Sequence, residues 1–217
     1  MTVVTISSAY GTGGRLIGAE VARRLRLSFA DEVITAALAD HFVLPVGDVA
    51  AHEMHESSFW EHFAFLAGLW SGAGYTPGPL DDCHAFRAES EQMIRQVATS
   101  GAVIIGRGAA IVLRDCADAL HVRLDGPVEA RIAQAVDIGG IDEHTARRRQ
   151  RHVDRAREHY VRHYYHADIT DPQHFDVVLD ATNLPLATCV EIIVAGARHI
   201  GTLGEAGLSA HRLRRTA

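Results

Sequence analysis

The chain has 217 residues, of which 47% are hydrophobic and 22% charged, and its formal net charge at neutral pH is −6. This mixture excludes a wholly disordered chain, and the excess of acidic groups argues against a general nucleic-acid binder. No uncharged apolar run reaches the roughly 18 residues that a membrane-spanning helix needs. The first residues lack the features of a secretory signal and the three cysteines are scattered, so we expect a cytoplasmic protein without disulfides.

The hydrophobic pattern predicts strands that alternate with helices along the chain. Apolar runs mark strands at residues 2–6, 102–105, 119–124 and 175–182, and a shorter element at 27–30. Helices are predicted at 15–27, 32–42, 45–69, 84–100, 142–165 and 185–200, and one more begins at Pro127. Because the strands are continuous apolar runs rather than alternating ones, we expect a mostly parallel sheet covered by helices on both faces.

Three features follow predicted strands, at the edge where sheets of this kind bind ligands. They are the glycine-rich loop after the first strand, the Gly106-Arg107-Gly108 segment, and Asp125. The loop, SSAYGTGGR at residues 7–15, leads directly into a helix. Its glycines allow successive N–H groups to point inward and the helix N-terminus adds partial positive charge, so the segment predicts an anion site.

The Walker A motif, GxxxxGK[ST], is incomplete in this loop. If Gly13 is its second glycine, Gly14 stands at the lysine position, Arg15 at the hydroxyl position and Ser8 at the first glycine. A tight strand–helix turn without a ligand is one alternative. A dinucleotide fold, with Asp31 as the acid that binds ribose, is another, although GxGxxG would need glycine at Leu16.

Every cationic side chain except histidine is an arginine: the chain has 21 arginines and no lysine. Seven of them, against two acids, lie between residues 147 and 166. Helical spacing places four on one stripe, namely Arg148, Arg151, Arg155 and Arg162. Phosphoryl transfer needs positioned cations of this kind, and the segment suits a mobile lid. The alternatives are a solvated basic helix or a nucleic-acid patch.

Three segments together resemble the cytidylate kinase-like family of P-loop proteins. They are SAYGTGGRLIG after the first strand, VIIGRGA, and VDRAREHYVRHYYHADITDPQHFDVVLDATNL. The resemblance extends over about residues 2–42 and 88–200, and the distal segment is its most specific part. The absence of the Walker lysine is itself a trait of this family.

The resemblance implies a three-layer α/β P-loop kinase fold of the nucleoside monophosphate kinase type. This fold has a five-stranded parallel sheet with helices on both faces, and we expect one domain over residues 1–201. A helical acceptor-side insertion is expected at 31–100, an arginine-rich lid at 141–170 and a flexible tail at 202–217.

The same resemblance implies roles for individual residues. ATP is expected to bind Tyr10, Gly11, Thr12, Gly13, Gly14 and Arg15. The acceptor is expected to contact Asp31, Arg107 and Arg131, and the transferring phosphoryl group to meet Arg15, Arg148, Arg151, Arg155 and Arg157. No direct metal ligand is predicted: Mg²⁺ would bridge donor oxygens through water, with Asp125 as the candidate to hold that water.

The function expected from these features is ATP-dependent phosphoryl transfer to a small acceptor, in particular a nucleoside monophosphate such as CMP. A nucleotide-binding sensor that does not turn over is the main alternative, and nucleic-acid binding through the arginine-rich segment is a weaker one. We expect a small-molecule nucleotide as the partner and no membrane. The sequence leaves open the acceptor, the donor nucleotide and the oligomeric state, a homodimer included.

Overall fold

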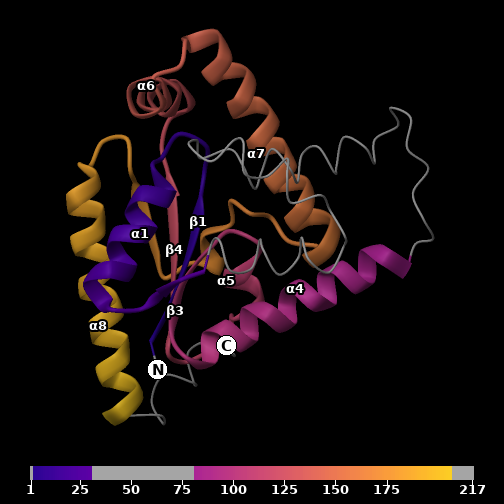
Figure 1. Ribbon diagram of the computed structural model, residues 1–217, viewed down its shortest axis with the longest axis vertical. Coiled ribbons are helices and arrows are strands. Elements are labelled where there is room, and N and C mark those ends of the chain that lie inside the picture. Colours follow the sequence, from indigo (N-terminus) through magenta and orange to yellow (C-terminus); the bar gives the residue numbers. More distant parts are fainter. Residues whose placement is uncertain (1, 31–80, 207–217) are drawn as a thin grey trace, which may run out of the picture.

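The structure is a computed structural model that describes residues 2–30 and 81–206 (Figure 1). Its centre is a sheet of five parallel strands in the order β2-β3-β1-β4-β5. The strands are β1 (Val3–Ser8), β2 (Ser28–Phe29), β3 (Ala102–Ile105), β4 (Ala119–Asp125) and β5 (Val177–Asp180). The predicted five-stranded parallel sheet is therefore confirmed, with β1 in the central position.

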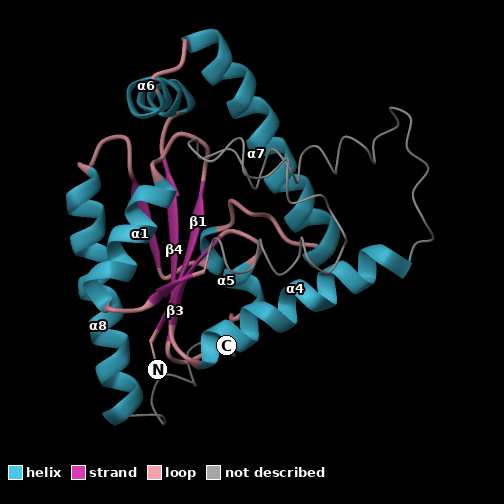
Figure 2. Cartoon of the chain, in the orientation of Figure 1, coloured by secondary structure: helices cyan, strands magenta, loops and turns pink. Residues whose placement is uncertain are grey.

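Helices cover both faces of the sheet (Figure 2). They are α1 (Gly14–Leu25), α4 (Asp81–Thr99), α5 (Ala109–Val112), α6 (Val128–Gly139), α7 (Glu143–Tyr165) and α8 (Leu186–Ala206). Helices α1 and α8 contact each other on one side, while α4 and α5 lie on the other. The predicted helices at 32–42 and 45–69 lie outside the described residues. In the described part of the chain no helix has both the length and the apolarity to cross a membrane.

The apolar face of the sheet forms the main core. Alternate residues of β1 and β4 point toward α1 and α8, because side chains in a strand alternate between its two faces. The buried side chains on this face include Val4, Ile6, Leu120, Val122 and Leu124. Ile17 and Val21 of α1 pack against them, as does Ile193 of α8. This packing fixes the first helix, and with it the loop that precedes the helix, against the sheet.

The opposite face of β1 and β4 is apolar where the strands begin, because Val3 and Ala119 belong to a second core, and it is polar further along. The strand register pairs Thr5 with His121 and Ser7 with Arg123. Thr5 Oγ1 lies 2.8 Å from His121 Nδ1, and Arg123 Nη1 donates to Ser7 Oγ over 3.2 Å. Buried polar side chains are tolerated where they find such partners. The sheet is therefore amphipathic at its centre, and its polar face meets the cavity described next.

Candidate functional site

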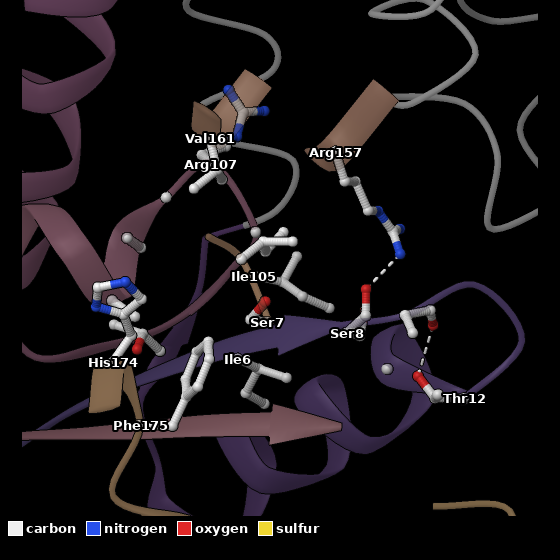
Figure 3. Close-up of a pocket in the computed structure, with 18 of the residues that line it drawn as sticks. Ile6, Ser7, Ser8, Thr12, Ile105, Arg107, Arg157, Val161, His174 and Phe175 are labelled. Atoms are coloured by element: carbon white, nitrogen blue, oxygen red, sulfur yellow. Dashed lines mark hydrogen bonds between the residues drawn. The ribbon is translucent and has the colours of Figure 1, made fainter. Parts of the chain in front are cut away.

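A cavity lies where β1 and β3 end (Figure 3). It encloses about 1000 Å³, with the open solvent at its mouth included. Its lining comes from residues 5–15 and 105–111, from Ile169, His174 and Phe175, and from α7, which contributes Arg157, Tyr160 and Val161. The structure thus brings the predicted glycine loop, the segment after β3 and one arginine of α7 to a single cavity.

The glycine loop turns sharply at two residues that adopt left-handed backbone angles. Gly11 has φ 83° and Gly13, the residue before α1, has φ 67°. A Cβ on Gly11 would lie 2.1 Å from the backbone oxygen of Arg131, so no other residue fits there without displacement of α6. The N–H groups in the first turn of α1 have no acceptor within the helix. The loop and helix together form a cradle suited to an anion.

Relative to the Walker A pattern, a side chain is present at Ser8, where the motif has glycine, and absent at Gly14, where the motif has lysine. A Cβ on Gly14, at the lysine position, would lie 2.5 Å from both Cβ and Oγ of Ser8. Ser8 itself stands at the position of the first glycine of the motif. The side chain of Ser8 therefore occupies the space that a residue at position 14 would need. The absence of the lysine therefore leaves no unfilled space beside Gly14, because Ser8 packs there.

An ion pair between α6 and α7 holds the loop from behind. Arg131 Nη1 lies 2.7 Å from Asp154 Oδ2 and 3.0 Å from the carbonyl oxygen of Tyr10. The Tyr10 N–H donates to Asp154 Oδ1 over 2.9 Å. Burial by itself would raise the pKa of Asp154, but the hydrogen bonds from Arg131, Tyr10 and Gln150 outweigh it and hold that pKa below its usual range. Arg131 is 5% exposed, and its guanidinium contacts the protein.

Arg157 lies one turn further along α7 and reaches the mouth of the cradle. Its Nη1 donates to the carbonyl oxygen of Ser8, and Figure 3 shows the guanidinium directed at that residue. Arg15, in the first turn of α1, is partly exposed and also lines the cavity. Two of the arginines predicted to act on the phosphoryl group thus border the loop.

The segment after β3 has an unusual backbone. Gly106, Arg107 and Gly108 all have positive φ, at 70°, 56° and 66°. A non-glycine residue in this region is strained and such residues concentrate at functional sites. Arg107 lines the cavity but is only 3% exposed, and in Figure 3 its guanidinium points away from Ser8. A Cβ on Gly108 would lie 2.5 Å from the ring of Tyr165, so α7 packs closely on this turn.

The stripe of arginines on α7 exists but faces away from the cavity. Arg148, Arg151 and Arg155 are exposed and do not line the cavity. The inward face of α7 carries instead Ala146, Val153, Tyr160, Val161 and Tyr164. The expected closure of these three arginines over the reacting group has no support from this arrangement. Asp31 lies outside the described residues.

The carboxylate of Asp125 forms ion pairs with two arginines. Arg123 donates to Asp125 Oδ2 through Nε and Nη2, over 3.1 and 2.8 Å, and Arg131 Nε lies 3.8 Å from Asp125 Oδ1. In the described part of the chain no three acidic, histidine or cysteine side chains gather closely enough to hold a metal ion. The carboxylates near the loop therefore do not fit a direct Mg²⁺ site, because guanidinium groups already occupy them.

Arg123 was missed by the sequence analysis. It is a charged residue within the apolar run ALHVRLD, and its side chain is buried in the structure. A charge inside a predicted buried strand implies a polar partner or a site, because isolated buried charges are costly. That signal was available in the sequence, although it could not identify Asp125 and Ser7 as the partners.

Comparisons with known proteins agree with this geometry. The model of the cytidylate kinase-like family matches residues 3–183, whereas no curated protein matches the chain. An uncharacterized protein from Eubacterium ventriosum ATCC 27560 has a TM-score of 0.65 at 19% identity, over 91% of this chain and 98% of its own. A gluconokinase from Sinorhizobium meliloti 1021 has a TM-score of 0.52 at 16% identity, over 95% and 97%. The fold is therefore that of the P-loop kinases.

Proposed function

The chain belongs to the cytidylate kinase-like family, and we propose that it transfers the γ-phosphoryl group of ATP to a small acceptor, a nucleoside monophosphate such as CMP. The observation that carries this proposal is the shared cavity, in which the glycine loop, the strained turn after β3 and Arg157 meet. A polyphosphate is the ligand that suits a cradle of N–H groups with a guanidinium at its mouth.

The glycine loop would bind the donor. N–H groups of Gly11, Gly13, Gly14 and Arg15 would donate to the phosphate oxygens, while the positive end of α1 adds to the attraction. Magnesium would enter with ATP as part of the substrate, since the carboxylates near the loop do not fit a direct site. In the reaction the bond from the γ-phosphorus to the bridging oxygen breaks, ADP leaves, and a bond forms to an acceptor oxygen.

Arg157 is the cation best placed to act on the transferring group. Its guanidinium lies at the loop, whereas Arg148, Arg151 and Arg155 lie on the outer face of the same helix. A guanidinium that neutralises charge on the phosphoryl oxygens lowers the barrier to transfer. In phosphoryl transfer such an arginine raises the rate by about 10³–10⁵. Arg15 is the second candidate because it also borders the cavity.

The acceptor would lie in the remainder of the cavity, between the turn after β3 and residues 169–175. Its walls there include Ile105, Ile111, Val161, Ile169 and Phe175. An apolar wall of this kind suits the flat ring of a base, while Arg107 on the same turn supplies a cationic side chain. This arrangement favours a nucleotide over a small polar acceptor.

The proposal is tested by ADP release in a coupled assay with ATP and a panel of nucleoside monophosphates. We expect turnover with at least one of them. Arg157→Ala should lower kcat by at least about a hundredfold, whereas Arg155→Ala, two residues away and exposed, should change it little. Equal losses in the two variants would contradict the role given to Arg157, and no turnover with any acceptor would contradict the kinase.

A nucleotide sensor that does not turn over is the second candidate, because the Walker lysine is absent and Ser8 fills the space beside Gly14 at its position. It predicts that ATP raises the melting temperature of the protein although no monophosphate is phosphorylated. The same panel, combined with a thermal shift measurement, therefore separates the two functions.

A further inference from the structure

Two charged side chains behind the glycine loop, Arg131 and Asp154, form a pair that we call the loop clamp. They come from different helices and do not line the cavity, but both contact the backbone of Tyr10, which does. Three features of this pair bear on its role at the loop.

The first feature is that the clamp makes several hydrogen bonds at once. Arg131 Nε donates to the carbonyl oxygen of Gly126 over 2.9 Å, and Nη1 donates both to Tyr10 O and to Asp154 Oδ2. Gln150 Nε2 donates to the same carboxylate oxygen of Asp154 over 2.9 Å. Neither side chain can rotate without loss of several of these contacts, so the pair has one geometry.

The second feature is that one ion pair holds both backbone polar groups of a single loop residue. Asp154 accepts the N–H of Tyr10 while Arg131 donates to its carbonyl oxygen. These contacts fix the two peptide planes that flank Tyr10. The next residue, Gly11, is then pressed against the backbone of Arg131 at φ 83°. The direction in which the following N–H groups point is thus set from outside the loop.

The third feature is that the clamp adds no net charge. Its cation and anion cancel, while Arg157, three residues beyond Asp154, supplies the positive charge at the mouth of the cradle. Stability alone is a weak reason for a buried ion pair, because well-packed apolar side chains in its place are often as stable or more so. A pair that determines backbone direction is needed where a ligand must meet preformed donors.

We propose that Arg131 and Asp154 are positioning residues that hold the glycine loop in the conformation that accepts a polyphosphate. The identity of this ligand rests on the proposed function. The clamp gives Arg131 a task other than direct contact with the acceptor, and it ties the middle of α7 to the loop. A lid movement of the arginine-rich helix would then have to occur on the N-terminal side of Gln150.

The test separates positioning from stability by means of two variants. Asp154→Asn removes the nearer counter-charge of Arg131, at 2.7 Å, and among the described residues leaves only Asp125 at 3.8 Å, so a loss of stability is expected. Arg131→Met with Asp154→Leu replaces the pair by apolar side chains, which should restore the free energy of unfolding. Glu158→Gln is the matched control, because it breaks an exposed ion pair with Arg162 on the same helix.

Two measurements are made on the full chain. Hydrogen exchange of the peptide covering residues 8–15, without nucleotide and relative to the amides of β1, reports the loop. Calorimetric titration with ATP and Mg²⁺ reports the site. In both clamp variants we expect faster loop exchange and a Kd weakened by about tenfold to a hundredfold, as for lost hydrogen bonds to charged groups. Glu158→Gln should change neither.

Wild-type loop exchange and wild-type affinity in the Arg131→Met, Asp154→Leu variant would overturn the clamp. If that variant does not fold, Asp154→Asn decides by the same criterion, since its loop exchange is measured against its own β1. Failure of the wild type to bind ATP would overturn the proposed function instead, and the loop exchange of the variants would still decide whether the pair positions the loop.

Discussion

At the scale of single residues, the loop shows how a missing side chain is compensated by a neighbour. Gly14 lacks the Walker lysine because Ser8 fills the space beside it. We predict that Gly14→Lys destabilises the protein by about 1–3 kcal/mol, the usual cost of overpacking, and that Ser8→Gly added to it recovers part of the loss. Urea unfolding of both variants and of Ser8→Gly alone measures this. Equal stability of Gly14→Lys with and without Ser8→Gly would contradict the claim that Ser8 fills the space beside Gly14.

The sequence allowed the loop residues to be predicted but not the residues that hold the loop. Glycines directly after a first strand have a local signature, whereas Tyr10 and Asp154 are separated by 144 positions. No local pattern encodes such a pairing, because it depends on how α6 and α7 return over the end of the sheet. The role implied for Arg131 illustrates this: an arginine that is a candidate ligand in sequence lies in a network of protein contacts.

At the scale of elements, α7 shows what periodicity can and cannot predict. Its predicted range, 142–165, is confirmed: the helix spans Glu143–Tyr165 and Asp142 caps it by accepting the N–H of Thr145. The stripe of arginines was also correct as a stripe. In this structure Arg148, Arg151 and Arg155 lie on the exposed side of the helix, because the apolar residues at helical spacing on the opposite side are the ones that face the protein. Their role at the transferring phosphoryl group stays a prediction. When two faces of a helix are both patterned, the apolar one marks the interior.

Two further elements differ from the prediction for simple physical reasons. Helix α5 is only four residues long and follows Gly108, so it has too few positions for a periodic signal. Helix α8 continues to Ala206 rather than ending near Ile200, which places residues 202–206 of the expected tail in the helix. Glycine at 201 and 204 weakens helix propensity, and the contact of α8 with α1 joins segments far apart in the sequence.

At the scale of the whole molecule, stability should fall progressively in acid. Six carboxyl groups of the described residues have pKa values below their ordinary ones: Glu20, Glu129, Asp142, Asp154, Asp168 and Asp180. A depressed pKa in the folded state contributes stability that is complete above the unfolded value, about 4, and is lost as the pH falls through the folded value. Asp154 is the most buried of the six, so it should contribute most.

Urea unfolding between pH 7 and pH 2.5 measures this dependence. We expect little change in the free energy of unfolding down to about pH 5 and a progressive loss below it. Asp154→Asn should give a shallower acid slope than Asp142→Asn, which removes an exposed carboxylate from the same helix. The same slope in both variants would show that the Asp154 carboxylate is not held by its partners in solution.

The central claim is that the main-chain donors of the glycine loop, with Arg157 beside them, enclose a polyphosphate. Its most direct test is an amide chemical-shift titration of the ¹⁵N-labelled protein with ATP and Mg²⁺. We predict that the largest shifts occur at Gly11, Gly13, Gly14 and Arg15, and that Arg157→Ala reduces them at equal nucleotide concentration. Shifts that leave these four amides unchanged and appear instead along the outer arginines of α7 would contradict the account.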